Sequence, residues 1–291
     1  MPPAFGRCPV AEFFDAAANY AFVQYALLAG VLASIACGIV GTYVVVRRIT
    51  YIAGGISHCV LGGIGAALYF QRVHGWAWLS PLYGAIVAAL AAAMIIGIVS
   101  LRAKQREDTV IGALWAIGMA VGVLFIAKTP GYSQDLMSYL FGNILMVSQQ
   151  DLWLIAALDA LVVTLGLVFY NQFLAVCFDE EFARVRGMRV EFYYLLLLGL
   201  TALTVVLLVT VVGIVLVIAL LTLPVAVAGY FARRLWQMMA LAAFLSMLFT
   251  TAGLAISYQP DLPAGATVIV LAGAVYLVVV IGARLLRPRI S

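Results

Sequence analysis

Two ionisable side chains, His58 and Asp159, lie inside segments apolar enough to cross a membrane. A charged group in the hydrocarbon core is costly, so such residues usually face protein or water and serve ion or proton pathways. A neutral imidazole suits a borderline transition metal, and the neighbouring Cys59 offers a softer thiol. His58, Cys59 and Asp159 are therefore the candidate metal or transport-pathway residues. The alternative is structural, with each side chain hydrogen-bonded to a neighbouring helix.

Small residues surround the histidine. On a helix, Gly54, His58 and Gly62 form one row, and Gly55 and Cys59 belong to the adjacent row. Small residues allow another helix backbone to come close, so His58 is expected to face protein or a water-filled cavity rather than lipid. We therefore expect Gly54, Gly55 and Gly62 to serve helix packing and gating. Because adjacent residues point about 100° apart on a helix, His58 and Cys59 reach one ion only from a broken helix or from symmetry-related copies.

The composition identifies the class of protein. The chain has 291 residues, of which 66% are hydrophobic and 10% charged, against about 25% charged in soluble domains. We predict an all-α, polytopic integral membrane protein with eight to nine transmembrane helices. The expected spans are 20–46, 56–71, 79–101, 109–128, 152–174, 192–210, 211–232, 237–257 and 264–285. The count is open because the sixth and seventh spans meet with almost no loop.

The basic residues predict the orientation. Nine spans with the N-terminus outside leave only Arg7, Arg72 and Lys128 on the outer side, and the other basic residues inside. Residues 1–19 would then be extracytoplasmic, 20–285 the membrane domain, and 286–291 a cytoplasmic tail. The apolar run 135–147 is too short to cross as a helix, so we expect it to be re-entrant or interfacial.

The loop 178–187 predicts a short cytoplasmic helix. Its acids come first and its arginines last, which matches the helix dipole, and Asp179 and Gly187 are suited to cap its two ends. An apolar stripe at helical spacing favours contact with the membrane surface or with a soluble partner, and composition does not separate the two. The residues expected to make this contact are Phe178, Asp179, Glu181, Phe182, Val185 and Gly187.

Pro224 lies inside an expected span, where it removes one backbone hydrogen bond. It predicts either a packing kink repaired by Thr222 or a hinge for gating.

Several function classes are excluded. The two lysines, Lys104 and Lys128, each follow an alanine, so the chain has no GxxxxGK[ST] phosphate loop, and it has no HExxH or GxSxG motif. The four cysteines form no CxxC pair, and the net charge of +4 gives no reason to expect nucleic acid as a partner. We therefore expect no ATP hydrolysis by this chain alone.

Five motifs together resemble the membrane permease subunit of zinc/manganese-type ABC transporters. They occur in the expected order and span about residues 21–285. The motifs are 47–58, 107–112, 135–145, 178–187 and 212–226.

The resemblance implies a homodimeric permease in the cytoplasmic membrane of a bacterium or archaeon. It implies cytoplasmic ABC ATPase subunits, an external metal-binding protein, contact with lipid, no permanently bound cofactor and a transported divalent ion. The 178–187 helix would be the coupling helix that docks on the ATPase. Many members carry Asp where this chain has Gly54. The metal site therefore carries over to His58 alone, with Cys59 and Asp159 as substitutes, and the loss of a hard carboxylate favours zinc over manganese or iron.

Three other functions stay open. One is an ABC permease for a chelated metal of the siderophore type, and another is a metal channel or carrier that needs no ATPase. The third is a structural or assembly protein of the membrane.

Overall fold

The computed structural model describes residues 9–102, 107–130, 142, 147–258, 260 and 262–286, and the elements in these ranges are helices. The all-α prediction is confirmed, and nine helices in the described part are long and apolar enough to span a membrane. Their bounds are α2 Ala21–Val46, α3 Thr50–Val73, α4 Pro81–Arg102, α5 Glu107–Lys128, α7 Gln149–Val168, α10 Val190–Val212, α11 Ile214–Phe231, α12 Leu235–Tyr258 and α13 Ala264–Leu286. Three shorter helices are α1 Pro9–Asn19, α8 Tyr170–Phe178 and α9 Glu180–Val185.

The junction between α10 and α11, which left the span count open, is a break at one glycine. Gly213 has φ 80° and ψ 163°, a conformation that favours glycine and ends α10. Gly142 packs against this break, because a Cβ built on it would lie 2.2 Å from the carbonyl carbon of Val212. The two apolar runs are therefore separate helices.

Pro224 is buried in α11. The side chain of Thr222, two residues earlier, bonds to the backbone of the same helix. The Thr222 hydroxyl donates to the Ile218 carbonyl at 2.7 Å. A threonine hydroxyl that bonds to a carbonyl of its own helix helps to satisfy the polar groups near a proline, so they do not face lipid. This arrangement fits the packing reading of Pro224, and its use as a hinge stays a prediction.

The fifth span differs from its prediction. The run 152–174 was expected to be one helix, but α7 ends at Val168 and a separate helix, α8, starts at Tyr170. Hydropathy records the length of an apolar run and not the direction of its backbone, so it does not reveal this change. The predicted interfacial segment 135–147 lies outside the described residues, apart from Gly142 and Val147, and so do residues 1–8 and 287–291.

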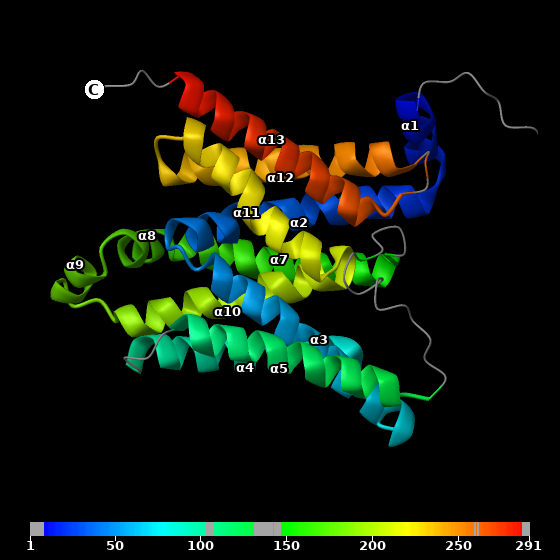
Figure 1. Cartoon of the computed structure of the whole chain (residues 1–291), viewed down its shortest axis with the longest axis horizontal. Coiled ribbons are helices and arrows are strands. Elements are labelled where there is room, and N and C mark those ends of the chain that lie inside the picture. The colour runs from blue at the N-terminus through cyan, green and yellow to red at the C-terminus, as the bar shows by residue number, and fades with distance from the viewer. Residues whose placement is uncertain are drawn as a thin grey trace, which may run out of the picture.

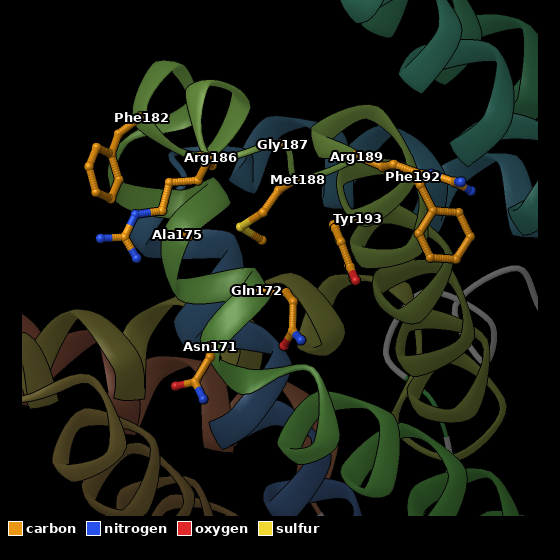
Figure 2. Close-up of a pocket in the computed structure, with 11 residues that line it drawn as sticks. Asn171, Gln172, Ala175, Phe182, Arg186, Gly187, Met188, Arg189, Phe192 and Tyr193 are labelled. Atoms are coloured by element: carbon orange, nitrogen blue, oxygen red, sulfur yellow. The ribbon is translucent and has the colours of Figure 1, made fainter.

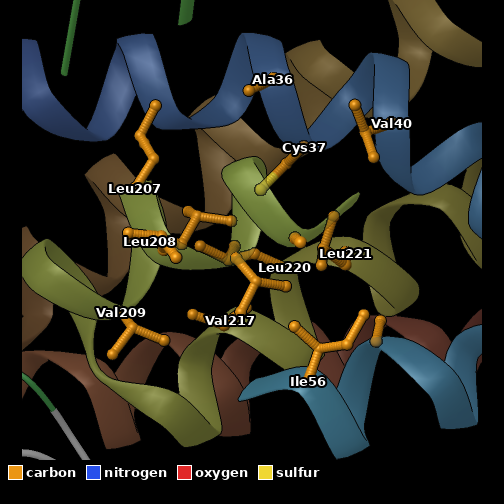
Figure 3. Close-up of a cluster of buried hydrophobic side chains, with 14 of the residues drawn as sticks. Ala36, Cys37, Val40, Ile56, Leu207, Leu208, Val209, Val217, Leu220 and Leu221 are labelled. Carbon is orange, nitrogen blue, oxygen red and sulfur yellow. The ribbon is translucent and has the colours of Figure 1, made fainter. Parts of the chain in front are cut away.

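The helices pack on both sides of α2. Figure 1 shows α12 and α13 on one side of α2, and α3, α4 and α5 on the other; α9 lies at one end of the bundle and α1 near the opposite end. Figure 3 shows the buried centre, where Cys37 of α2, Ile56 of α3, Leu208 of α10 and Leu220 of α11 meet. This apolar core positions α3, the helix that carries His58.

Candidate functional site

His58 is held between two side chains of α5. Its ring stacks on Trp115 with centroids 4.3 Å apart and planes 17° apart, and its Nδ1 lies 3.0 Å from the Met119 sulfur. Trp115 and Met119 are four residues apart, so they share one face of α5. The histidine side chain is only 8% exposed. The imidazole therefore faces protein rather than lipid, and both its plane and one of its edges are in contact.

Small residues bring α3 and α5 together around this histidine. A Cβ built on Gly62 would lie 2.8 Å from the Gly118 carbonyl oxygen, and one built on Gly55 would lie 2.8 Å from the Ile111 side chain. At Gly54, a Cβ would lie 3.1 Å from the Trp115 ring. The indole thus fills the space into which a side chain at position 54 would extend.

Cys59 also packs on α5, against Leu114 and Gly118, which directly precede the two residues that hold His58. Its thiol donates a hydrogen bond to the Leu114 carbonyl, with sulfur and oxygen 3.2 Å apart, and the side chain is buried. Within the described ranges, no group of three or more His, Cys, Asp or Glu side chains is placed to hold a metal ion. The described part of one protomer does not supply a complete ligand set of these residue types.

Asp159 lies elsewhere in the bundle. It belongs to α7, is 5% exposed, and its carboxyl lies next to Ala36 and Cys37 of α2. Its Oδ1 has no hydrogen-bond partner among the described residues. Because Asp159 packs on α2 whereas His58 packs on α5, the fold does not bring the two predicted residues into one site.

The predicted short helix is present as α9, with the expected caps. Asp179 accepts a hydrogen bond from the Phe182 backbone N–H at 2.8 Å, and Gly187 has φ +77°. At the C-terminal end, the Gly187 N–H bonds to the Arg184 carbonyl and the Met188 N–H to the Ala183 carbonyl. This pair of bonds is the Schellman arrangement, which ends a helix at a glycine.

The apolar side chains on and beside α9 are exposed. Phe178 is 68% exposed, Phe182 51% and Val185 87%, and Glu181 is also exposed. A cavity of about 680 Å³ lies between α8, α9 and α10. Figure 2 shows Gln172, Met188 and Tyr193 around it, with Arg186 beside Phe182. The described chain therefore leaves this end uncovered.

An ion pair links α9 to the helix that precedes the histidine segment. Glu180 of α9 pairs with Arg47, the C-cap residue of α2, and also with Arg184 at 3.1 Å. The Arg47 guanidinium lies 5.5 Å from the ring centroid of Tyr194. Because α3 begins at Thr50, three residues after Arg47, this contact connects α9 with the segment that leads into α3.

Sequence reasoning missed Trp115, Met119 and the Arg47–Glu180 pair. Trp115 and Met119 lie in an apolar span and carry no charge, so they gave no signal of their own. The only available hint was their i,i+4 spacing, which is common in core helices.

The comparisons with known proteins decide the family. The model of the ABC 3 transport family matches residues 19–283. The chain belongs to that family. It is 45% identical to the "Uncharacterized membrane protein slr2045" of Synechocystis over 90% of this chain and 91% of that protein. It is 35% identical to the "Manganese transport system membrane protein MntC" of Halalkalibacterium halodurans, over 91% of this chain and 88% of that protein.

A solved structure agrees. "PsaBC from Streptococcus pneumoniae in complex with Fab" superposes with a TM-score of 0.82 at 32% identity, covering 93% of this chain and 95% of that one. The resemblance to an ABC permease is thus confirmed. The chain is a permease subunit and not an enzyme, with the ATPase on a separate chain.

Proposed function

We propose that this chain is the membrane permease of an ATP-driven importer for a divalent transition-metal ion, with His58 as a ligand in transit. The observation that carries the proposal is a buried imidazole in the N-terminal half of α3, held by residues of a neighbouring helix and not exposed to lipid. Intramembrane ionisable residues mark ion pathways. Relatives whose names specify metal transport support the same substrate class.

Zinc is the ion that the local chemistry favours. Imidazole suits zinc, whereas manganese prefers carboxylate, carbonyl and water oxygens. Position 54 has no carboxylate, and the indole of Trp115 occupies its space. Manganese is the direct competitor, because several relatives are named for manganese transport. Iron is a third candidate.

The permease is proposed to work as a homodimer. The described part of one protomer lacks a full ligand set, and two copies facing each other would supply two His58 imidazoles. Cys59 and Asp159 are kept as further pathway candidates, although the thiol is engaged with Leu114 and the carboxyl lies against α2. An external metal-binding protein would deliver the ion to the end opposite α9.

The ATPase is proposed to dock on α9. The exposed Phe178, Phe182 and Val185 provide an apolar contact, and the N-cap Asp179 and Gly187 hold the helix in shape. Closure of the ATPase dimer would displace α9, and the Arg47–Glu180 pair would pass this movement to the start of α3. The membrane is proposed to be a bacterial or archaeal cytoplasmic membrane, with α9 inside and the N-terminus outside.

The experiment is metal uptake by the reconstituted complex of permease and ATPase, comparing native protein with His58→Ala for zinc, manganese and iron. We expect uptake of one ion to fall at least tenfold while assembly persists. His74→Ala is the matched control, because the chain has only these two histidines and His74 is exposed at the end of α3. Normal uptake by His58→Ala would remove the histidine from the pathway.

The same liposomes test the rival functions. A channel or carrier would move metal without the ATPase, and a permease for chelated metal would prefer a metal–chelator complex to the free ion. Native uptake that requires the ATPase and prefers the free ion is the expected result.

A further inference from the structure

The contact between His58 and Met119 determines which ring nitrogen can hold a proton. A thioether sulfur has no hydrogen to donate and acts only as an acceptor. Nδ1 lies 3.0 Å from that sulfur, so this contact is a hydrogen bond only in the tautomer that carries the proton on Nδ1. In the neutral imidazole, which is the form that binds a metal ion, the other nitrogen then carries the lone pair.

We propose that Met119 is a positioning residue that holds His58 in the Nδ1–H tautomer, so that Nε2 is the nitrogen offered to a metal ion. The proposal deepens the transport function argued above and rests on it for the identity of the ion. A metal binds the unprotonated nitrogen, and the partner of the opposite nitrogen sets which one that is.

Trp115 completes the positioning. The indole stacks on the ring face, so it restricts the plane of the imidazole, while the Met119 sulfur restricts rotation within that plane. Gly54 is part of the same arrangement, because a side chain there would push against the indole. Two contacts from one face of α5 therefore define both the orientation and the tautomer of His58.

A thioether partner also suits a histidine that must bind a metal ion and then release it during transport. Metal-binding histidines commonly donate their second N–H to a carboxylate or carbonyl, which raises the basicity of the ligand. A thioether is a weaker acceptor, so it orients the ring with less increase in basicity. The imidazole would then bind an ion more weakly and release it more readily than a histidine held by a carboxylate.

The decisive experiment is nitrogen NMR of the full-length permease in lipid bilayers with isotope-labelled histidine. The chain has two histidines, so His74→Ala assigns the remaining signals to His58. We expect a protonated Nδ1 and an unprotonated Nε2, and we expect added zinc ions to shift the Nε2 signal more than the Nδ1 signal. Met119→Leu conserves side-chain size without an acceptor and should shift the tautomer towards Nε2–H.

The outcome is independent of transport. A native His58 in the Nε2–H form, or a tautomer unchanged by Met119→Leu, would overturn the proposal even if His58→Ala abolishes uptake. Conversely, normal uptake by His58→Ala would overturn the transport role while the NMR result stands by itself. In uptake, Met119→Leu should raise the zinc concentration for half-maximal rate by about tenfold, the low end for loss of a metal ligand's partner, with a smaller change in maximal rate.

Discussion

The α3–α5 interface and the α9 end of the bundle are built in opposite ways. At the interface, His58 is 8% exposed and is held by an indole, a thioether and closely packed glycines. At the other end, Val185 is 87% exposed, and the local backbone is held by an N-cap carboxylate and a C-terminal glycine. The proposed ion site thus depends on the fit between two helices, whereas the proposed docking helix depends on its own few residues.

This difference suits the two proposed roles. A buried site must exclude lipid and limit the positions an ion can take, which requires close contacts around the ligand side chain. A docking helix must keep its shape while its outer face stays free for another protein. The Arg47–Glu180 pair connects α9 with the residues that lead into α3, so a mutation of this pair tests whether the two regions are coupled.

The largest expected effect is a loss of stability when the α3–α5 interface is overpacked. In Gly62→Val the added Cβ would lie 2.8 Å from the Gly118 carbonyl oxygen, which is rigid backbone. Overpacking of this kind costs about 1–3 kcal/mol or more. We expect a clear fall in the melting temperature of the purified permease and loss of uptake.

Gly187→Ala is the matched control at the other end. No atom lies within 4 Å of its built Cβ, although φ is +77°. Strain should cost about 1–2 kcal/mol, and we expect α9 to relieve it by shortening locally, so the melting temperature of the bundle should change little. Equal loss of stability in both variants would contradict the contrast between the two regions.

The second effect is release of the ATPase. Phe182→Asp combined with Val185→Asp places two charges on the exposed face of α9, so the permease should stay folded but no longer retain the ATPase in detergent pull-downs. Trp78→Asp controls for surface charge, because Trp78 is 70% exposed and lies in the loop between α3 and α4. Undiminished binding by the double variant would remove α9 as the docking site.

The third effect is on ion selectivity. Gly54→Asp alone should weaken uptake, because its Cβ would compress Trp115 at 3.1 Å. Adding Trp115→Ala makes room, and a hard carboxylate four residues before His58 should then shift preference from zinc towards manganese, by roughly tenfold, or about 1.4 kcal/mol. Competition uptake with both ions measures this shift. An unchanged preference would show that position 54 does not face the ion.

The smallest effect is on the link between the regions. Glu180→Gln removes the charge that pairs with Arg47, a partly exposed contact worth about 1 kcal/mol or less. Assembly should persist, while the stimulation of ATP hydrolysis by metal falls severalfold. Arg184→Ala removes only the exposed pair within α9 and should change the stimulation less. If both variants behave alike, the Arg47 contact does not transmit movement.

Local features of the sequence predicted much of the architecture. Long apolar runs indicated the spans, and Gly213 separated two of them within the expected region. Asp179 and Gly187 predicted the limits of α9 to within a few residues, because capping involves only neighbouring backbone groups. The break between α7 and α8 escaped detection because both helices lie in one apolar run.

By itself, then, the sequence determined that the protein is a helical membrane protein, where its short helix α9 lies and that His58 is its most unusual intramembrane residue. These properties follow from hydropathy and capping, which act over a few residues or one helix. Only the tertiary structure decided that Met119 and Trp115 hold His58, that Asp159 packs on α2 instead, and that Arg47 meets Glu180. Those pairings join residues far apart in the chain, and they depend on how the helices pack, which no single segment encodes.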